Sequence, residues 1–121
     1  MRLTTSDRLL ILGVPTKDQL ESFSAQLPGG LIACLASDEE IRTARREFAH
    51  LDNVMFTPGA SDEIPWRDEL FTVVTDLLPE WTNPQQTQRE IRRVMAPGAA
   101  LFTPRTPEGF EAAGSGEFVK P

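Results

Sequence analysis

The stretch that decides the fold is "RLLILGVPTKDQL", residues 8–20. Its four consecutive apolar residues, "LLIL", are typical of a strand that is covered on both faces. Gly13 follows as a turn, and Thr16 with Gln19 forms the capping-box pattern that opens a helix. Nucleotide-binding α/β folds place a phosphate or cofactor loop in such a strand–turn–helix unit. The turn here, "GVPTK", has one glycine where such loops have three.

The same alternation of apolar runs and helical segments continues along the chain. Further strands are predicted at residues 31–36, 53–57, 70–78 and 99–103, and helices at residues 16–27, 37–51 and 83–95. Strands without polar alternation, separated by helices, indicate a mostly parallel sheet with helices on both faces. We therefore expect an α/β fold, a Rossmann-like three-layer sandwich with five strands in the order 3-2-1-4-5.

Length and composition limit the class of protein. At 121 residues the chain is expected to form one domain, residues 1–104, followed by a tail over residues 105–121. The net charge of −6 gives no basic surface, so nucleic acid is not expected as a partner. No apolar run approaches the ~20 residues that span a bilayer, so no membrane partner is expected. The single cysteine, Cys34, fits a reducing, cytoplasmic location.

The side chains that most often take part in chemistry are few. His50 is the only histidine and is expected at a helix end, and Cys34 is expected to be a buried apolar group. One histidine and one cysteine cannot form a zinc-type set of four ligands, so no metal site is predicted. The acids of residues 62–69 and the arginines of residues 89–93 are interpreted as solvated surface, with Glu90 available for local pairing. No catalytic residue is assigned.

Several segments, in this order, resemble the class I S-adenosylmethionine-dependent methyltransferases. Residues 53–74, "NVMFTPGASDEIPWRDELFTVV", are similar to that family's third strand, adenine-contacting loop and fourth strand. Residues 89–101, "REIRRVMAPGAAL", are similar to its "E-x-x-R-V-L-x-P-G-G" signature. "RLLILGVPTK" lies where the family has its glycine-rich motif, and "GGLIACLASDEEIRTAR" where it has its second strand and helix. The resemblance implies a Rossmann-like fold over about residues 8–104.

The glycine-rich motif keeps only its first glycine. The resemblance places the family's three glycines on Gly13, Pro15 and Lys17. A proline ring and a lysine side chain would obstruct the approach of the backbone to a ligand. We therefore expect the turn from Gly13 to Lys17 to be a structural connection.

Four acidic positions of the family hold other residue types. The acid before the glycine loop, the ribose-binding acid, the adenine-binding acid and the acid of the fourth strand fall on Ile11, Leu35, Ala60 and Thr72. A leucine cannot accept hydrogen bonds from ribose hydroxyls, and a buried hydroxyl left unpaired costs about 1–3 kcal/mol. No cofactor is therefore expected to bind. The cofactor-binding positions that the resemblance predicts, all as vestiges, are Gly13, Pro15, Leu35 and Ala60.

The chain ends soon after the fifth predicted strand, with "PRTPEGFEAAGSGEFVKP" at residues 104–121. The family normally continues with a helix and an antiparallel hairpin, and neither is expected here. An uncovered fifth strand would be an exposed sheet edge, which readily pairs with another strand. Either the tail, through "GEFVK", or a second copy in a two-fold homodimer is expected to cover this edge.

Three functions follow from these patterns. The favoured hypothesis is a methyltransferase-like domain that has lost S-adenosylmethionine binding and catalysis and acts as an interaction or assembly module. The second is a minimal, divergent S-adenosylmethionine-dependent methyltransferase, in which Asp38 or Asp62 replaces the missing acids. The third is a Rossmann-like domain that binds another small ligand at the carboxyl ends of the strands. No substrate or pathway follows from the sequence.

Overall fold

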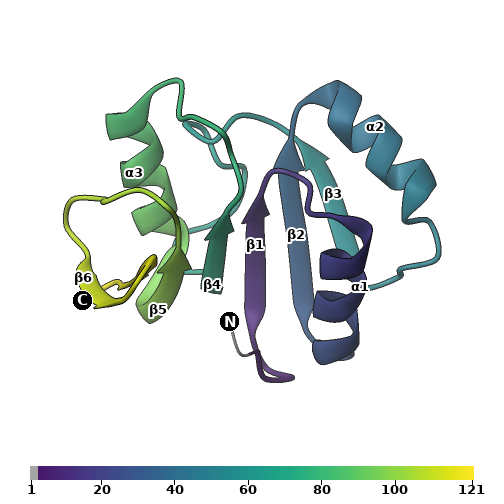
Figure 1. Cartoon of the computed structure of the whole chain (residues 1–121), viewed down its shortest axis with the longest axis horizontal. Coiled ribbons are helices and arrows are strands. Elements are labelled where there is room, and N and C mark those ends of the chain that lie inside the picture. Colours follow the sequence, from purple (N-terminus) through teal and green to yellow (C-terminus); the bar gives the residue numbers. More distant parts are fainter. Residues whose placement is uncertain (1–2) are drawn as a thin grey trace.

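The computed structural model describes residues 3–121 and contains one mixed sheet with helices on both faces (Figure 1). The strands are β1 (Arg8–Leu12), β2 (Leu31–Ala36), β3 (Val54–Pro58), β4 (Phe71–Asp76), β5 (Met95–Phe102), β6 (Glu111–Gly114) and β7 (Glu117–Val119). The helices are α1 (Lys17–Gln26), α2 (Asp38–Glu47) and α3 (Pro84–Val94). The strand order is β3-β2-β1-β4-β5-β7-β6, and the first five strands run parallel. The predicted α/β, Rossmann-like fold is confirmed.

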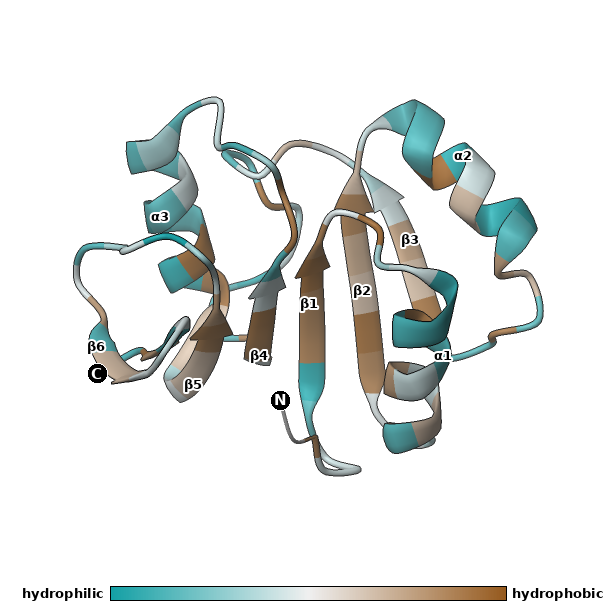
Figure 2. Cartoon of the chain, viewed as in Figure 1, coloured by the Kyte–Doolittle hydropathy of each residue, from teal (hydrophilic) through white to brown (hydrophobic). Residues whose placement is uncertain are grey.

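The central strands are buried on both faces, as their continuous apolar runs predict. One face packs Leu9 and Ile11 of β1 against α1 and α2, and the other face packs Leu10 and Leu12 against α3. Figure 2 shows the consequence, with hydrophobic residues concentrated in β1, β2 and β4 and polar residues on the outer surfaces of the helices. The alternate side chains of each strand therefore fill two separate cores.

The helices begin where the capping signals predict. Thr16 caps α1 in a capping box, because the Thr16 Oγ1 accepts from the Gln19 backbone N–H at 3.3 Å and the Gln19 Oε1 accepts from the Thr16 N–H at 3.1 Å. The Ser37 Oγ accepts from the Glu40 N–H at 3.3 Å at the start of α2. Among the described residues, no helix is long and apolar enough to cross a membrane.

The C-terminal segment forms a hairpin, so the expectation that the hairpin is absent is wrong. β7 pairs antiparallel with β5, with Phe118 opposite Leu101, and β6 pairs with β7. The tail, through the predicted "GEFVK", covers the edge of the fifth strand. Phe110 and Phe118 pack against the core beneath α3, and the Lys120 Nζ donates to the Arg92 carbonyl oxygen at 2.8 Å. These tertiary contacts stabilise strands that show little strand pattern of their own.

Candidate functional site

A cleft of about 280 Å³ lies at the carboxyl ends of β2, β3 and β4. Its walls come from the end of β2, the first turn of α2, and the segments that follow β3 and β4. The residues that line it are Leu35, Ala36, Ser37, Glu40, Gly59, Ala60, Ser61, Asp62, Leu78, Glu80 and Thr82. In open α/β sheets the carboxyl ends of the strands are where ligands bind. We refer to this hollow as the cleft.

Polar groups around the cleft are mainly acceptors. The carboxylates of Glu40, Asp62 and Glu80 line it; Asp62 is half-buried, and the two glutamates are exposed. The Ser37 Oγ donates to the Glu40 Oε1 at 2.9 Å, so these two side chains are oriented together. Carboxylates accept hydrogen bonds from hydroxyl and amino groups and attract positive charge. The cleft is therefore suited to a ligand that is rich in donors or cationic.

Two of the four predicted cofactor positions, Leu35 and Ala60, line the cleft. Leu35 is only 2% exposed and belongs to the core beneath α3. A Cβ built on Gly59 would lie 2.8 Å from the Leu35 Cδ1, so the leucine side chain fills the space beside this glycine. Ala60 is exposed. The leucine thus narrows the cleft where the family has an acid, and Asp62 lines it while Asp38 does not.

The other two predicted positions, Gly13 and Pro15, do not line the cleft. Gly13 has a φ of +107°, and its N–H donates to the Leu35 carbonyl oxygen at 2.8 Å. A Cβ on Gly13 would lie 3.4 Å from the Cβ of Leu77, which follows β4. Pro15 is buried. The first N–H of the turn is thus bonded within the protein and is not free to bind a ligand.

Thr72 lies at the opposite end of the sheet, so counting it as a lost cofactor acid was wrong. The Thr72 Oγ1 accepts from the Arg8 N–H at 2.8 Å and donates to the Asp7 Oδ1 at 2.8 Å, at the amino end of β1. Burial raises the pKa of Asp7, but hydrogen bonds from the Thr4 backbone and Thr72 outweigh it, leaving the pKa lowered. Asp7 therefore supplies a carboxylate beside this position. Ile11, another presumed loss, is a fully buried core residue.

A buried ion pair beside the cleft was not anticipated from the sequence. The Asp76 carboxylate, at the end of β4, is fully buried and accepts from the Arg105 Nη1 at 2.5 Å and the Thr103 Oγ1 at 2.7 Å. The Arg105 Nη2 donates to the Leu78 carbonyl oxygen at 3.1 Å, and the guanidinium lies 4.7 Å from the Trp81 ring centroid. This group fixes the segment after β4 to the segment after β5. An acid at the end of a buried strand was the available signal.

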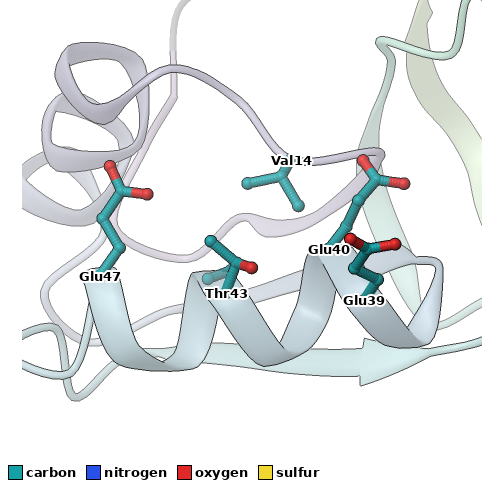
Figure 3. Close-up of a pocket in the computed structure, with 6 residues that line it drawn as sticks. Val14, Glu39, Glu40, Thr43 and Glu47 are labelled. Atoms are coloured by element: carbon teal, nitrogen blue, oxygen red, sulfur yellow. The ribbon is translucent and has the colours of Figure 1, made fainter.

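A second hollow, of about 270 Å³, lies between the turn after β1 and α2. Figure 3 shows Val14 directed toward α2 over Thr43, with Glu47 at one end and Glu39 and Glu40 at the other.

In residues 3–121, no group of three or more histidine, cysteine or acidic side chains is arranged to hold a metal ion. Burial raises the pKa of the Cys34 thiol to about 12, so it is protonated at neutral pH.

A doubly wound, mostly parallel sheet with a cleft at the carboxyl ends of its strands is the architecture of Rossmann-like α/β proteins. The family model described as "Methyltransferase domain" matches residues 11–103, and the chain belongs to this family. The resemblance to class I S-adenosylmethionine-dependent methyltransferases is thereby confirmed. No curated protein sequence matches the chain.

Solved structures support the family fold. A SAM-dependent methyltransferase from Aquifex aeolicus superposes with a TM-score of 0.74 at 17% identity, over 93% of this chain and 64% of that one. A methyltransferase in complex with the Haloferax volcanii Trm112 methyltransferase activator gives 0.71 at 24% identity, over 84% and 46%. The [4+2]-cyclase SpnF gives 0.67 at 25% identity, over 82% and 38%. The chain spans less than two thirds of the length of each of these structures.

The expectation that this chain has no cofactor is wrong. It belongs to a methyltransferase family, and its structural neighbours include SAM-dependent methyltransferases, which bind S-adenosylmethionine. The expectation was based on side chains at single positions. Gly13 and Pro15 lie away from the cleft, Thr72 lies at the other end of the sheet, and Asp62 lines the cleft two residues after Ala60.

Proposed function

We propose that the cleft of this methyltransferase-family domain binds S-adenosylmethionine through its adenosyl part. The observation that supports this is the position of the cleft at the carboxyl ends of β2–β4, together with the carboxylates of Glu40, Asp62 and Glu80 on its walls. Such groups can accept hydrogen bonds from ribose hydroxyls and the adenine amino group. S-Adenosylmethionine, when bound, supplies an electrophilic methyl group on a sulfonium sulfur, and methyl transfer is the proposed reaction class.

The residues present suit the adenosyl part better than the methionine part. Ser37 and Glu40 follow β2, beside the leucine that occupies the ribose-binding position, and Asp62 follows β3. The turn at Gly13, by contrast, uses its N–H on the Leu35 carbonyl oxygen. The cleft volume of about 280 Å³ lies just below the ~300–1,000 Å³ of pockets that enclose drug-sized ligands. The ligand would therefore be only partly enclosed.

Two aspartates that the sequence could not distinguish provide the test. Asp62 lines the cleft and Asp38 does not, so Asp62→Asn and Asp38→Asn remove the same charge from different places. We expect Asp62→Asn to weaken S-adenosylmethionine and S-adenosylhomocysteine binding about tenfold in calorimetry, the size of one hydrogen bond to a charged group. Asp38→Asn should leave both affinities unchanged. Absence of binding by the unmodified protein, or equal effects of the two changes, would refute the proposal.

A second candidate, an assembly role, is favoured by the outer edge of the C-terminal hairpin. β6 ends the sheet, and all four of its residues are exposed. An unpaired strand edge can pair with a second strand. The Haloferax structure shows a methyltransferase of this fold bound to another protein. We propose a two-fold homodimer through β6; light scattering over about a tenfold range of concentration tests it, and a monomer throughout would rule it out.

A further inference from the structure

The segment between β3 and β4, residues 59–70, is held in place mainly by α3. We refer to this segment as the β3–β4 loop. Of the described backbone–backbone hydrogen bonds, only one joins two residues of the loop, from the Glu63 N–H to the Ala60 carbonyl oxygen at 3.1 Å. The loop contains the cleft residues Ser61 and Asp62. The position of this wall of the cleft therefore depends on contacts with other elements.

The guanidinium of Arg93 provides most of these contacts. Its Nη1 donates to the Trp66 carbonyl oxygen and to the Asp68 Oδ1, both at 2.8 Å, and its Nη2 donates to the Ile64 carbonyl oxygen at 2.8 Å. Its Nε and Nη2 also donate to the Glu90 carboxylate at 2.8 and 3.1 Å. A guanidinium has five N–H donors in a fixed planar arrangement. These five bonds use all of them.

Glu90 and Thr87 extend the same set of contacts along one face of α3. The Glu90 Oε1 accepts from the Ile64 N–H at 2.8 Å, so both backbone groups of Ile64 are bonded to the Glu90–Arg93 pair. The Thr87 Oγ1 lies 3.1 Å from the Ser61 Oγ. Thr87, Glu90 and Arg93 are spaced by three residues, which places them on one side of the helix. We refer to these three residues as the α3 network.

The wall that the α3 network supports is thin. Gly59 and Ala60 line the cleft on one side and also line another hollow, of about 500 Å³, which is bordered by Glu90 and Arg93. The wall therefore has little packing of its own between the cleft and the α3 network. Ile64 is 3% exposed and anchors the loop beyond the wall. A change in the α3 network would shift the wall more readily than it would disturb either core.

We propose that Arg93 is a positioning residue for the cleft, and that it acts by holding the β3–β4 loop so that Ser61 and Asp62 face the ligand. The part that concerns the ligand rests on the proposed function of the cleft. Arg93 does not line the cleft and touches it only through the loop. In this role Glu90 and Arg93, the "E-x-x-R" part of the sequence signature, hold the β3–β4 loop. Their positions on the surface of a helix do not by themselves indicate this.

The first test measures the loop directly and needs no ligand. Hydrogen exchange is compared in Arg93→Gln and in Arg89→Gln, a control on the same helix whose side chain makes one intrahelical bond at 3.4 Å. Loss of the Arg93 contacts should speed exchange about tenfold or more at the Ile64 amide, whose acceptor Glu90 is held by the guanidinium. The β1, β2 and β4 amides should be unchanged. Equal acceleration throughout the protein, or an unchanged loop, would overturn the proposal.

The second test links the loop to the ligand. Calorimetry with S-adenosylhomocysteine should show about tenfold weaker binding in Arg93→Gln and no change in Arg89→Gln. Arg93→Lys keeps the charge but cannot reproduce the planar set of donors, so its affinity should remain below that of the unmodified protein. An Arg93→Gln protein with a mobile loop and unchanged affinity would overturn the positioning role. If the unmodified protein binds no ligand, the proposed function fails, and hydrogen exchange still decides whether Arg93 holds the loop.

Discussion

Two glycine-containing connections follow parallel strands at the same end of this sheet, and they are built in different ways. Gly13, after β1, has a φ of +107°, is buried and gives its N–H to the Leu35 carbonyl oxygen. Gly59, after β3, is exposed, lines the cleft and is approached by the Leu35 side chain alone. The Gly59 N–H also donates to β2, to the Ala36 carbonyl oxygen at 2.9 Å, so the two connections differ in the φ of the glycine and in its exposure. Space for a ligand therefore lies beside the second connection.

The segment that covers the Gly13 turn is the one that Asp76 and Arg105 fix in place. Leu77 lies over Gly13, and its N–H donates to the Leu12 carbonyl oxygen at 2.9 Å. The next residue, Leu78, donates its N–H to the Asp76 Oδ1 and accepts from Arg105. The position of Leu77 over the Gly13 turn thus depends on the buried ion pair of Asp76 and Arg105. The β3–β4 loop depends instead on the partly exposed Arg93.

The largest expected effect comes from breaking the buried pair. Arg105→Met would leave the fully buried Asp76 carboxylate without its counter-ion, and breaking such pairs typically costs about 3–5 kcal/mol. We expect the free energy of unfolding, measured by urea titration with tryptophan fluorescence, to fall by about that amount. Arg89→Met is the matched control, with an expected change within about 0.5 kcal/mol. A fall in Arg105→Met no larger than in the control would show that the covering does not depend on this pair.

The next effect separates the two glycines. In Gly13→Ala the new side chain must adopt a φ near +107° beside Leu77, so the free energy of unfolding should fall by about 1–3 kcal/mol with little change in ligand affinity. In Gly59→Ala the new Cβ meets only the end of a flexible leucine side chain, so stability should change less. Because Gly59 lines the cleft, the affinity for S-adenosylhomocysteine should fall more in Gly59→Ala than in Gly13→Ala. The reverse order of effects, measured by urea titration and calorimetry, would contradict the comparison.

Features that depend on neighbouring residues could be predicted from the sequence, and features that depend on distant residues could not. Continuous apolar runs such as residues 31–36 and local caps such as Thr16 are determined by neighbouring residues, and these predictions were confirmed. The strands of residues 111–119 lack such a pattern, because β7 forms against β5 and β6 forms against β7. The sequence predicts a solvated Arg93, because the partners of this side chain, apart from Glu90, lie 25–29 residues away in the sequence. Contacts of that range are not visible in helical periodicity.

The cofactor positions were harder still, because one aligned position does not tell which side chains surround it. Leu35 lines the cleft, and its side chain fills the space beside Gly59. Thr72 follows the same aligned pattern and lies at the amino end of the sheet, beside Asp7. Asp62 could be proposed from the sequence only together with Asp38. Its place on the cleft wall depends on the path of the β3–β4 loop.

The smallest expected effect is the response of that loop to acid. The hydrogen bond from Arg93, opposed by partial burial and aided by the Ile64 N–H, holds the pKa of Glu90 below its ordinary value of 4.5. Because the folded-state pKa is lowered, the stabilisation from Glu90 is fully present above about pH 4.5 and is lost as the pH falls through the lower folded-state pKa. Hydrogen exchange at Ile64, corrected for its intrinsic pH dependence, should therefore show loss of protection in this acidic range. Glu90→Gln should lack this step, whereas Glu39→Gln, on α2, should retain it. A step that persists in Glu90→Gln would assign the acid sensitivity to another carboxylate, such as Asp7 at the far end of the sheet, whose pKa is also lowered.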